Sequence, residues 1–144
     1  MNAALAPAAV VVRRTIAASA EDLFDAWLDP QALAQWMRPG TIQSTVAHVE
    51  PRVGGRYEIT MQAASGPILH QGVYRTIDRP RRLVFTLSER NLSRSQSRVN
   101  VEIVPAGIGC ELTLVHENVP PDQASRIEGR WAGMLYGLEI LIGR

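Results

Sequence analysis

The chain of 144 residues is 46% hydrophobic, which is enough to form the core of one domain. Its formal net charge of +1 gives no overall field that attracts nucleic acid or an anionic membrane, and neither is expected as a partner. All fifteen basic residues are arginine, which excludes mechanisms that need a lysine Schiff base, a P-loop lysine or a lysine general base. The single cysteine, Cys110, cannot form an internal disulfide, and no secretory signal or membrane span is recognisable. We therefore expect a cytoplasmic protein.

The first residues of the chain differ in composition from the rest. Residues 1–8 are rich in alanine and are expected to form a flexible N-terminus, so that a single domain would span residues 9–144. The β-branched run from Val10 to Ile16 predicts the first strand of that domain.

Two short helices are expected after this strand. Ser19 is a typical N-cap for the first helix, and Asp29 followed by Pro30 begins the second, which would end at Pro39-Gly40. Apolar residues recur at helical spacing in both segments. The apolar faces consist of Ala20, Phe24, Trp27 and Leu28 in the first helix, and of Leu33, Trp36 and Met37 in the second.

The remainder of the chain predicts a sheet followed by a long helix. Between Ile42 and about His116 apolar and polar residues alternate, and five short turn segments interrupt the alternation, which predicts six strands joined as antiparallel hairpins. The pattern then becomes helical, with apolar residues on one broad face. This face consists of Ile127, Trp131, Met134, Leu135, Leu138, Leu141 and Ile142. The fold class is therefore α+β, with a curved antiparallel sheet of about seven strands.

The adjacent glycines Gly54 and Gly55 raise the question of a phosphate-binding loop. Such loops lie between a strand and the N-terminus of a helix. Here an alternating strand pattern follows the glycines, beginning at Arg56. We interpret the pair as a turn that needs positive φ or a bulge, and not as a nucleotide site.

Five segments in chain order carry a family resemblance: FDAWLDPQALAQWM, VEPRVGGRYEITM, GVYRTIDRPRRLVFT, LTLVHENV and GRWAGMLYGL. Together with the order of elements they resemble the helix-grip fold of the START-like, SRPBCC superfamily. Within it they look like the branch related to activator of heat-shock-protein-90 ATPase homologues. The resemblance covers nearly the whole chain.

The resemblance implies a sheet that grips the C-terminal helix around an apolar cavity. It suggests a binding module for a small hydrophobic molecule, similar to a lipid, a polyketide or an aromatic compound, with no cofactor. Two alternatives remain: a cyclase or hydrolase that uses the same cavity, and an interaction protein of the chaperone co-regulator kind, with a part in stress response. The chaperone activators carry a further N-terminal domain, so direct chaperone activation is not expected.

Candidate ligand-binding residues follow from the alternation of the strands and from the helical faces. They are Trp36, Met37, Tyr57, Ile59, Met61, Tyr74, Phe85, Leu87, Leu112, His116, Trp131 and Leu135. The alternative is that these residues fill an ordinary core without a cavity. No catalytic residue and no metal ligand is assigned, because no nucleophile, base or metal-binding spacing is recognisable.

The polar candidates need hydrogen-bond partners if they are buried. Tyr57, Tyr74 and His116 are the groups that a ligand oxygen would satisfy or that would move a proton in an enzyme. For His116 a bond to the backbone or to Glu117 is expected, because no serine or cysteine partner is evident. His48 and His70 lie near predicted turns and are expected to be exposed.

Glycines recur at every fourth position of the C-terminal helix, at Gly129, Gly133 and Gly137. On a helical wheel they lie opposite Trp131, which places them on the outer side of the helix, next to Ile140. This predicts a two-fold homodimer through the helix. The alternative is that the glycines approach a neighbouring loop or the first short helices.

Overall fold

A computed structural model of the protein describes residues 7–89 and 96–143. The predicted flexible N-terminus at residues 1–8 and the predicted turn around residues 89–95 fall almost entirely outside these ranges.

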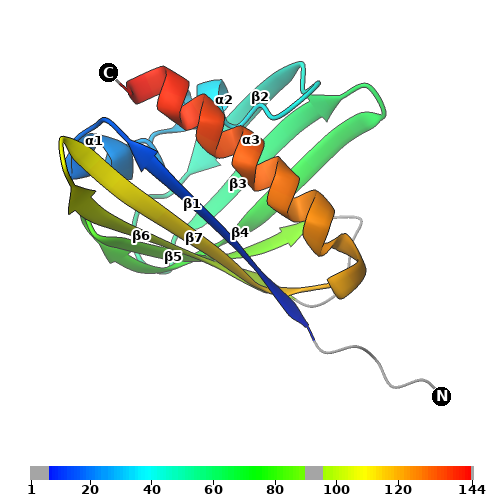
Figure 1. Ribbon diagram of the computed structural model, residues 1–144. Coiled ribbons are helices and arrows are strands. Elements are labelled where there is room, and N and C mark those ends of the chain that lie inside the picture. The colour runs from blue at the N-terminus through cyan, green and yellow to red at the C-terminus, as the bar shows by residue number, and fades with distance from the viewer. Residues whose placement is uncertain (1–6, 90–95, 144) are drawn as a thin grey trace.

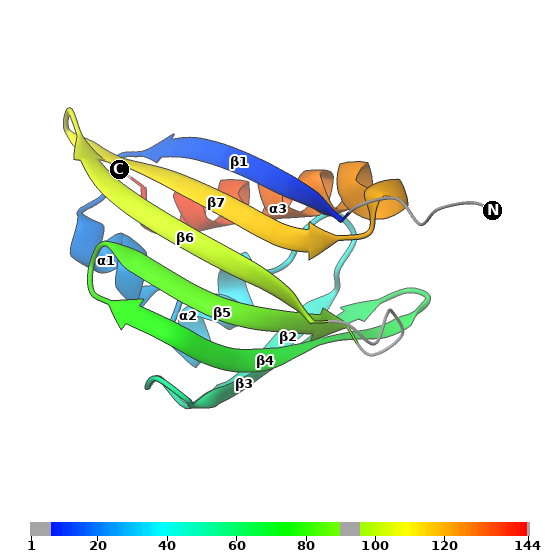
Figure 2. The same cartoon turned by 90° about the horizontal axis from the view of Figure 1, so that it is seen from below.

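The sheet has seven antiparallel strands in the order β1-β7-β6-β5-β4-β3-β2, with β1 and β2 at its two edges. Consecutive strands from β2 to β7 are neighbours, as expected for short hairpins. Figure 2 shows that the sheet curls, with β1 and β7 on one side of the molecule and β3 and β4 on the other. The strands are β1 (Ala8–Ile16), β2 (Ser44–Val49), β3 (Arg56–Ala63), β4 (Gly66–Asp78), β5 (Arg82–Glu89), β6 (Ser97–Ala106) and β7 (Gly109–Val119). The predicted sheet is confirmed.

The three α-helices also match the sequence pattern. The hydroxyl of Ser19 accepts a hydrogen bond from the Asp22 amide at the start of α1 (Ala20–Asp25), and the carboxylate of Asp29 accepts one from the Gln31 amide at the start of α2 (Pro30–Trp36). A 3-10 turn, η1 (Pro121–Gln123), precedes α3 (Ala124–Ile142). In Figure 1 α3 runs across the sheet, and α1 and α2 lie near the end where α3 finishes.

The core lies between the concave face of the sheet and these helices. Met134, Leu135 and Leu138 of α3 are fully buried, as are Leu112 and Leu114 of β7. Removal of this apolar surface from water is the main force that holds the helix against the sheet.

The glycine pair Gly54-Gly55 forms a turn between β2 and β3. Gly54 has a φ of +84°, and its amide donates to the Tyr74 carbonyl at 2.8 Å. The Tyr74 amide in turn donates to the Gly55 carbonyl at 3.0 Å. A Cβ on Gly55 would collide with the Glu50 carbonyl oxygen. The Gly54 amide is therefore used within the fold, and the turn ties the β2–β3 connection to β4.

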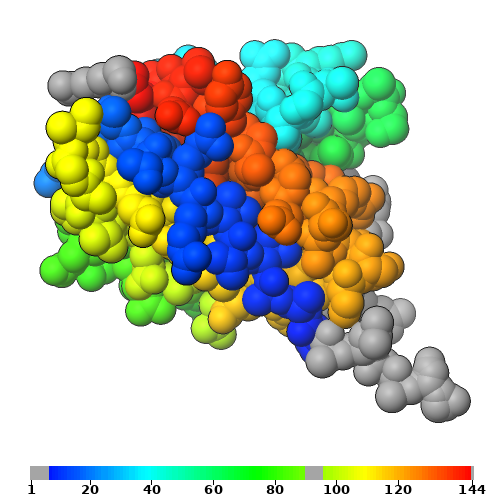
Figure 3. Space-filling view, in the orientation of Figure 1, coloured from blue at the N-terminus to red at the C-terminus, as the bar shows by residue number. Residues whose placement is uncertain are grey.

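The glycines of α3 do not form the outer stripe that the helical wheel predicted. A Cβ on Gly137 would lie 2.9 Å from the Trp36 carbonyl oxygen, and one on Gly133 would lie 3.3 Å from the Pro39 Cβ. These two glycines therefore face the end of α2, which was the alternative, and only Gly129 is open on all sides. The predicted dimer was based on close contact between these glycines in two copies of the helix, and Gly133 and Gly137 do not lie on the outer side that such a contact needs. Ile140, the residue expected beside them, is 66% exposed. Figure 3 shows the outer side of α3 between β1 and the β2–β3 end of the sheet.

Replacement of Phe24 by alanine should lower the free energy of unfolding by about 3–5 kcal/mol, because the ring is fully buried and leaves a cavity. Urea denaturation followed by circular dichroism measures the change. Val53→Ala is a suitable control, since Val53 is 63% exposed and its loss should change stability by about 0.5 kcal/mol or less. A loss below about 1 kcal/mol for Phe24→Ala would contradict the burial of this ring.

Glycine-to-alanine changes at two positions of α3 should have opposite effects. Gly137→Ala should destabilise the protein by about 1–3 kcal/mol, because its Cβ meets the Trp36 backbone and pushes α3 away from α2. Gly129→Ala should stabilise it by about 0.5–1 kcal/mol, because alanine favours the helix and nothing lies within 4 Å of the new Cβ. Thermal denaturation of both variants tests the packing, and equal effects would show that α3 does not approach α2 as described.

Candidate functional site

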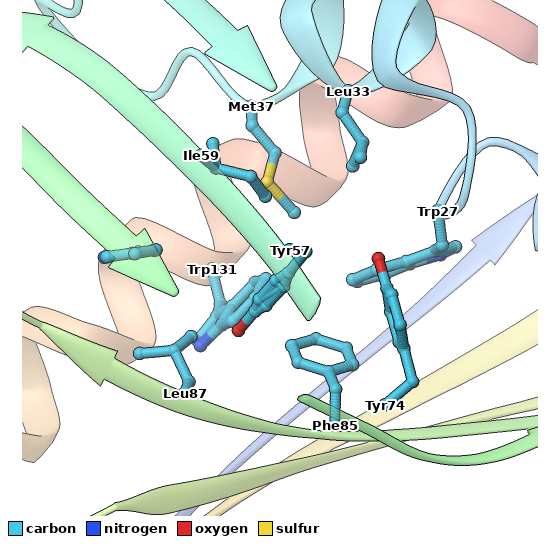
Figure 4. A pocket seen from close by; sticks show the side chains of 10 residues that line it. Trp27, Leu33, Met37, Tyr57, Ile59, Tyr74, Phe85, Leu87 and Trp131 are labelled. Atoms are coloured by element: carbon cyan, nitrogen blue, oxygen red, sulfur yellow. The ribbon is translucent and has the colours of Figure 1, made fainter. Parts of the chain in front are cut away.

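A small apolar cavity lies between the sheet, α2 and α3, with a volume of about 20 Å³. This is room for about one water molecule, so side chains fill most of the interior. In Figure 4 the side chains of Leu33, from α2, and of Met37, which follows α2, point toward the rings of Tyr57, Phe85 and Tyr74. The lining residues are Trp27, Leu33, Met37, Tyr57, Ile59, His70, Tyr74, Phe85, Leu87 and Trp131.

The lining contains many of the residues that the sequence predicted. Those that line the cavity are Met37, Tyr57, Ile59, Tyr74, Phe85, Leu87 and Trp131. Met61, Leu112 and Leu135 are instead fully buried in the surrounding core. Trp36 is also buried outside the lining, because its indole N–H donates to the Ala26 carbonyl at 3.0 Å and its ring packs edge-on against Trp27. His116 lines a separate cavity.

Three lining residues were missed in the sequence: Trp27, Leu33 and His70. Trp27 and Leu33 lie on the apolar faces of their helical segments, a signal that does not separate core packing from cavity lining. The expectation that His70 is exposed was wrong, since it is only 5% exposed. His70 lies well inside the long strand β4, where it pairs with Ile59 of β3 and Glu89 of β5. His48 is exposed, as expected.

The aromatic rings of the lining form one contact group. The ring centroids of Tyr57 and Phe85 are 5.4 Å apart, those of Tyr57 and Tyr74 are 5.5 Å apart, and those of Trp27 and Trp131 are 6.1 Å apart. These separations are typical of stabilising aromatic pairs. The Tyr57 hydroxyl donates to the Thr86 carbonyl at 2.7 Å. Burial raises the pKa of the hydroxyls of both Tyr57 and Tyr74, so both are neutral at physiological pH.

Two buried nitrogen atoms in the cavity lining have no hydrogen-bond partner. They are the indole Nε1 of Trp27 and the imidazole Nε2 of His70, the two buried side-chain polar atoms left unpaired in the described part of the chain. A buried polar atom without a partner costs about 1–3 kcal/mol. Both unpaired groups therefore belong to residues that line this cavity.

His116 is held in a chain of hydrogen bonds next to the cavity, through Trp131 of its lining. Its Nδ1 accepts from the indole N–H of Trp131 at 3.0 Å, and its Nε2 lies 2.7 Å from the Ser97 hydroxyl. The Ser97 hydroxyl donates to the Leu87 carbonyl at 2.8 Å. Because Nδ1 accepts, the proton of the neutral ring must lie on Nε2, which donates to Ser97. The expected bond to the backbone or to Glu117 was wrong, since the serine partner lies on the neighbouring strand.

This hydrogen-bond chain makes His116 a poor base toward Ser97. The nitrogen that faces the hydroxyl already carries the proton, so the pair does not have the arrangement of a serine nucleophile and its base. Burial lowers the pKa of His116 to about 4, with smaller effects from His70 and Glu89. The ring also lines a second cavity of about 50 Å³, next to Glu89 and Ile127.

The curved sheet, the long helix that it grips and the apolar cavity between them define a helix-grip domain of the START-like class. The family model described as "Activator of Hsp90 ATPase homolog 1-like protein" matches residues 17–143. The chain therefore belongs to this family. No curated protein matches the sequence significantly.

Several solved structures share the fold. A protein from Chromobacterium violaceum is 26% identical, with a TM-score of 0.84 over 93% of this chain and 96% of the other. An HSP90 activator from Plasmodium falciparum is 24% identical, with a TM-score of 0.73 over 92% of this chain and 94% of the other. DynU16, from the dynemicin biosynthetic locus, is 15% identical, with a TM-score of 0.77 over 92% of this chain and 46% of the other. No helix in residues 7–89 and 96–143 is both long and apolar enough to cross a membrane.

The stability of the protein should fall as the pH drops from about 6.5 to about 4, in part because of His116. The unfolded chain binds a proton at the ordinary pKa of 6.5, whereas the folded chain does so only at about 4. The neutral ring in the fold thus contributes about 3 kcal/mol that is present above pH 6.5 and lost at low pH. Urea denaturation at pH 7.0, 5.5 and 4.5 measures the slope.

The matched variant for this test is His116→Gln. An amide can accept from Trp131 and donate to Ser97 without titrating. As the pH falls, the free energy of unfolding of the wild type should therefore decrease more than that of His116→Gln. Parallel pH profiles would contradict the proposed state of His116.

Proposed function

We propose that the protein binds a small, mainly apolar molecule in the cavity between the sheet, α2 and α3. The observation that carries this proposal is the position of the two unpaired buried nitrogens, since both belong to residues that line this cavity. A ligand with a polar atom would supply a partner that the described part of the chain does not provide. The aromatic rings around them offer the flat apolar contact surface that such a ligand requires.

The small volume of the cavity means that the ligand must displace lining side chains. Met37 is suited to this movement, because its unbranched side chain adopts many shapes and it lies directly after the last residue of α2. Tyr74 has its hydroxyl directed toward the α2 side of the cavity in Figure 4. Closed and occupied states would then differ mainly at α2, while the sheet stays unchanged.

Ligand binding has more support than catalysis by the same residues. An enzyme of the cyclase or hydrolase kind would use Tyr57, Tyr74 or His116 to move a proton. The raised pKa of both tyrosines and the lowered pKa of His116 take all three groups away from the range near pH 7 in which a general acid or base is most effective. The likeness to an HSP90 activator is one of fold, and the interior described above favours a small-molecule ligand over a chaperone as the partner.

A fluorescence titration with N-phenyl-1-naphthylamine, an uncharged apolar probe, tests the proposal. Leu33→Phe should lower the affinity for this probe by about tenfold or more, because the larger side chain projects into the cavity. Leu23→Phe is the matched control, since Leu23 is equally buried in the neighbouring helix but does not line the cavity. It should leave the affinity within about twofold.

Native mass spectrometry of the purified protein gives an independent test, because a resident ligand would add to the mass of the chain. The proposal fails if the wild type carries no added mass and does not bind the probe. It also fails if both phenylalanine variants weaken binding equally, since the probe would then report on general loosening of the core.

A further inference from the structure

Three polar side chains meet beside the cavity, of which one, His70, belongs to its lining and another, Glu89, lines the second cavity. They are His70 of β4, Glu89 of β5 and Arg130 of α3. The Oε2 atom of Glu89 lies 3.7 Å from the His70 Nε2 and 3.5 Å from the Arg130 Nη1. The side chains of His70, Glu89 and Arg130 are 6%, 20% and 21% exposed, so that this group is largely shielded from solvent. A nitrogen from the sheet and one from the helix therefore face the same carboxylate oxygen.

Neither nitrogen makes a short bond to that oxygen. Charge-assisted N–H···O bonds are usually about 2.7–2.9 Å long. The contact with Arg130 is at the long limit of a hydrogen bond, and the contact with His70 is beyond it. The guanidinium has five N–H donors, and among the described residues its side-chain partner is Glu89, at this long distance. The nitrogens of His70 and Arg130 that face Glu89 therefore keep hydrogen-bonding capacity that Glu89 does not use.

The charges at this wall favour an additional anion. Arg126 lies one helical turn before Arg130 and adds a second guanidinium to the field at Glu89. Contact with the His70 imidazole, followed by the charges of Arg130 and Arg126, lowers the pKa of the Glu89 carboxyl, against the opposing effect of burial. Two guanidinium groups therefore act on a single carboxylate, Arg126 from an exposed position, so that the formal charge of the three groups is positive.

His70 connects this charged group to the apolar interior. Its ring belongs to the cavity lining together with Ile59, Leu87 and Trp131, and its buried Nε2 has no hydrogen-bond partner among the described residues. An oxygen placed at this wall would pair with the imidazole and also come under the field of Arg130. The rest of the ligand would extend among the aromatic rings.

We infer that the ligand of the cavity is an amphipathic acid, with a carboxylate or similar oxyanion at His70 and Arg130 and an apolar body among the aromatic side chains. This inference rests on the proposed function, since it specifies the chemical class of molecule that the same cavity takes. Glu89 competes with the ligand's anion for Arg130, and its partly exposed side chain can turn toward solvent when the anion binds.

Two fluorescent probes that differ by one charged group test the inference. They are 8-anilinonaphthalene-1-sulfonate and the uncharged N-phenyl-1-naphthylamine, measured on the full chain. The wild type should bind the sulfonate more tightly. Arg130→Gln should weaken sulfonate binding by about tenfold and leave the uncharged probe within about twofold. Glu89→Gln should strengthen sulfonate binding, because it removes the competing carboxylate.

Arg52→Gln is the matched control for loss of one positive charge. Arg52 is on the surface at the β2–β3 turn, with its side chain 68% exposed, and its removal should not change the binding of either probe. Circular dichroism and thermal denaturation establish that each variant is folded, and Glu89→Gln keeps the inference testable through a gain of affinity if Arg130→Gln does not fold.

The outcomes separate this inference from the proposed function. Binding of neither probe by the wild type overturns both. Tight binding of the uncharged probe with no preference for the sulfonate overturns the anionic ligand alone. Equal weakening of sulfonate binding by Arg130→Gln and Arg52→Gln would also overturn it, because the effect would then come from net charge.

Discussion

The sheet curves because its concave face must cover the apolar side of one long helix. Met134, Leu135 and Leu138 are completely buried where α3 packs against the sheet and against α2. Gly137 sets how closely α3 meets α2, since its missing side chain lets the Trp36 backbone approach. The lining of the cavity comes from the same elements, so the position of α3 determines both the stability of the domain and the shape of the site.

The polar side chains of the interior are of two kinds, those with hydrogen-bond partners and those without. The chain from Trp131 through His116 to Ser97 satisfies every one of the nitrogens and hydroxyls that it contains, and it links α3, β7 and β6. Such a closed network favours one arrangement of its members. His70 and Trp27, which line the cavity, instead have nitrogens that find no partner within residues 7–89 and 96–143. The first arrangement stabilises the fold, whereas the second is costly in the absence of a bound molecule and is typical of a functional site.

Most of the fold could be predicted from the sequence, because the change of hydrophobic period from helix to strand and back is clear. The site was predicted less completely. Alternation identified Tyr57, Ile59 and Phe85, but it does not give the distance of a residue from the nearest turn, and His70 was therefore placed at the surface. A helical wheel similarly shows that the Gly137 side of α3 is opposite Trp131, but not that α2 packs there. Long-range contacts of this kind depend on how elements cross, which local patterns do not encode.

The position of the tryptophans has a consequence for spectroscopy. The chain contains three tryptophans, of which Trp27 and Trp131 line the cavity and Trp36 packs against Trp27 with ring centroids 4.7 Å apart. All three indoles are 3% exposed or less. The ultraviolet emission of the protein therefore arises almost entirely from the cavity and its immediate wall. A molecule that enters the cavity would change the colour or the intensity of this light, so that the unlabelled protein reports its own occupancy.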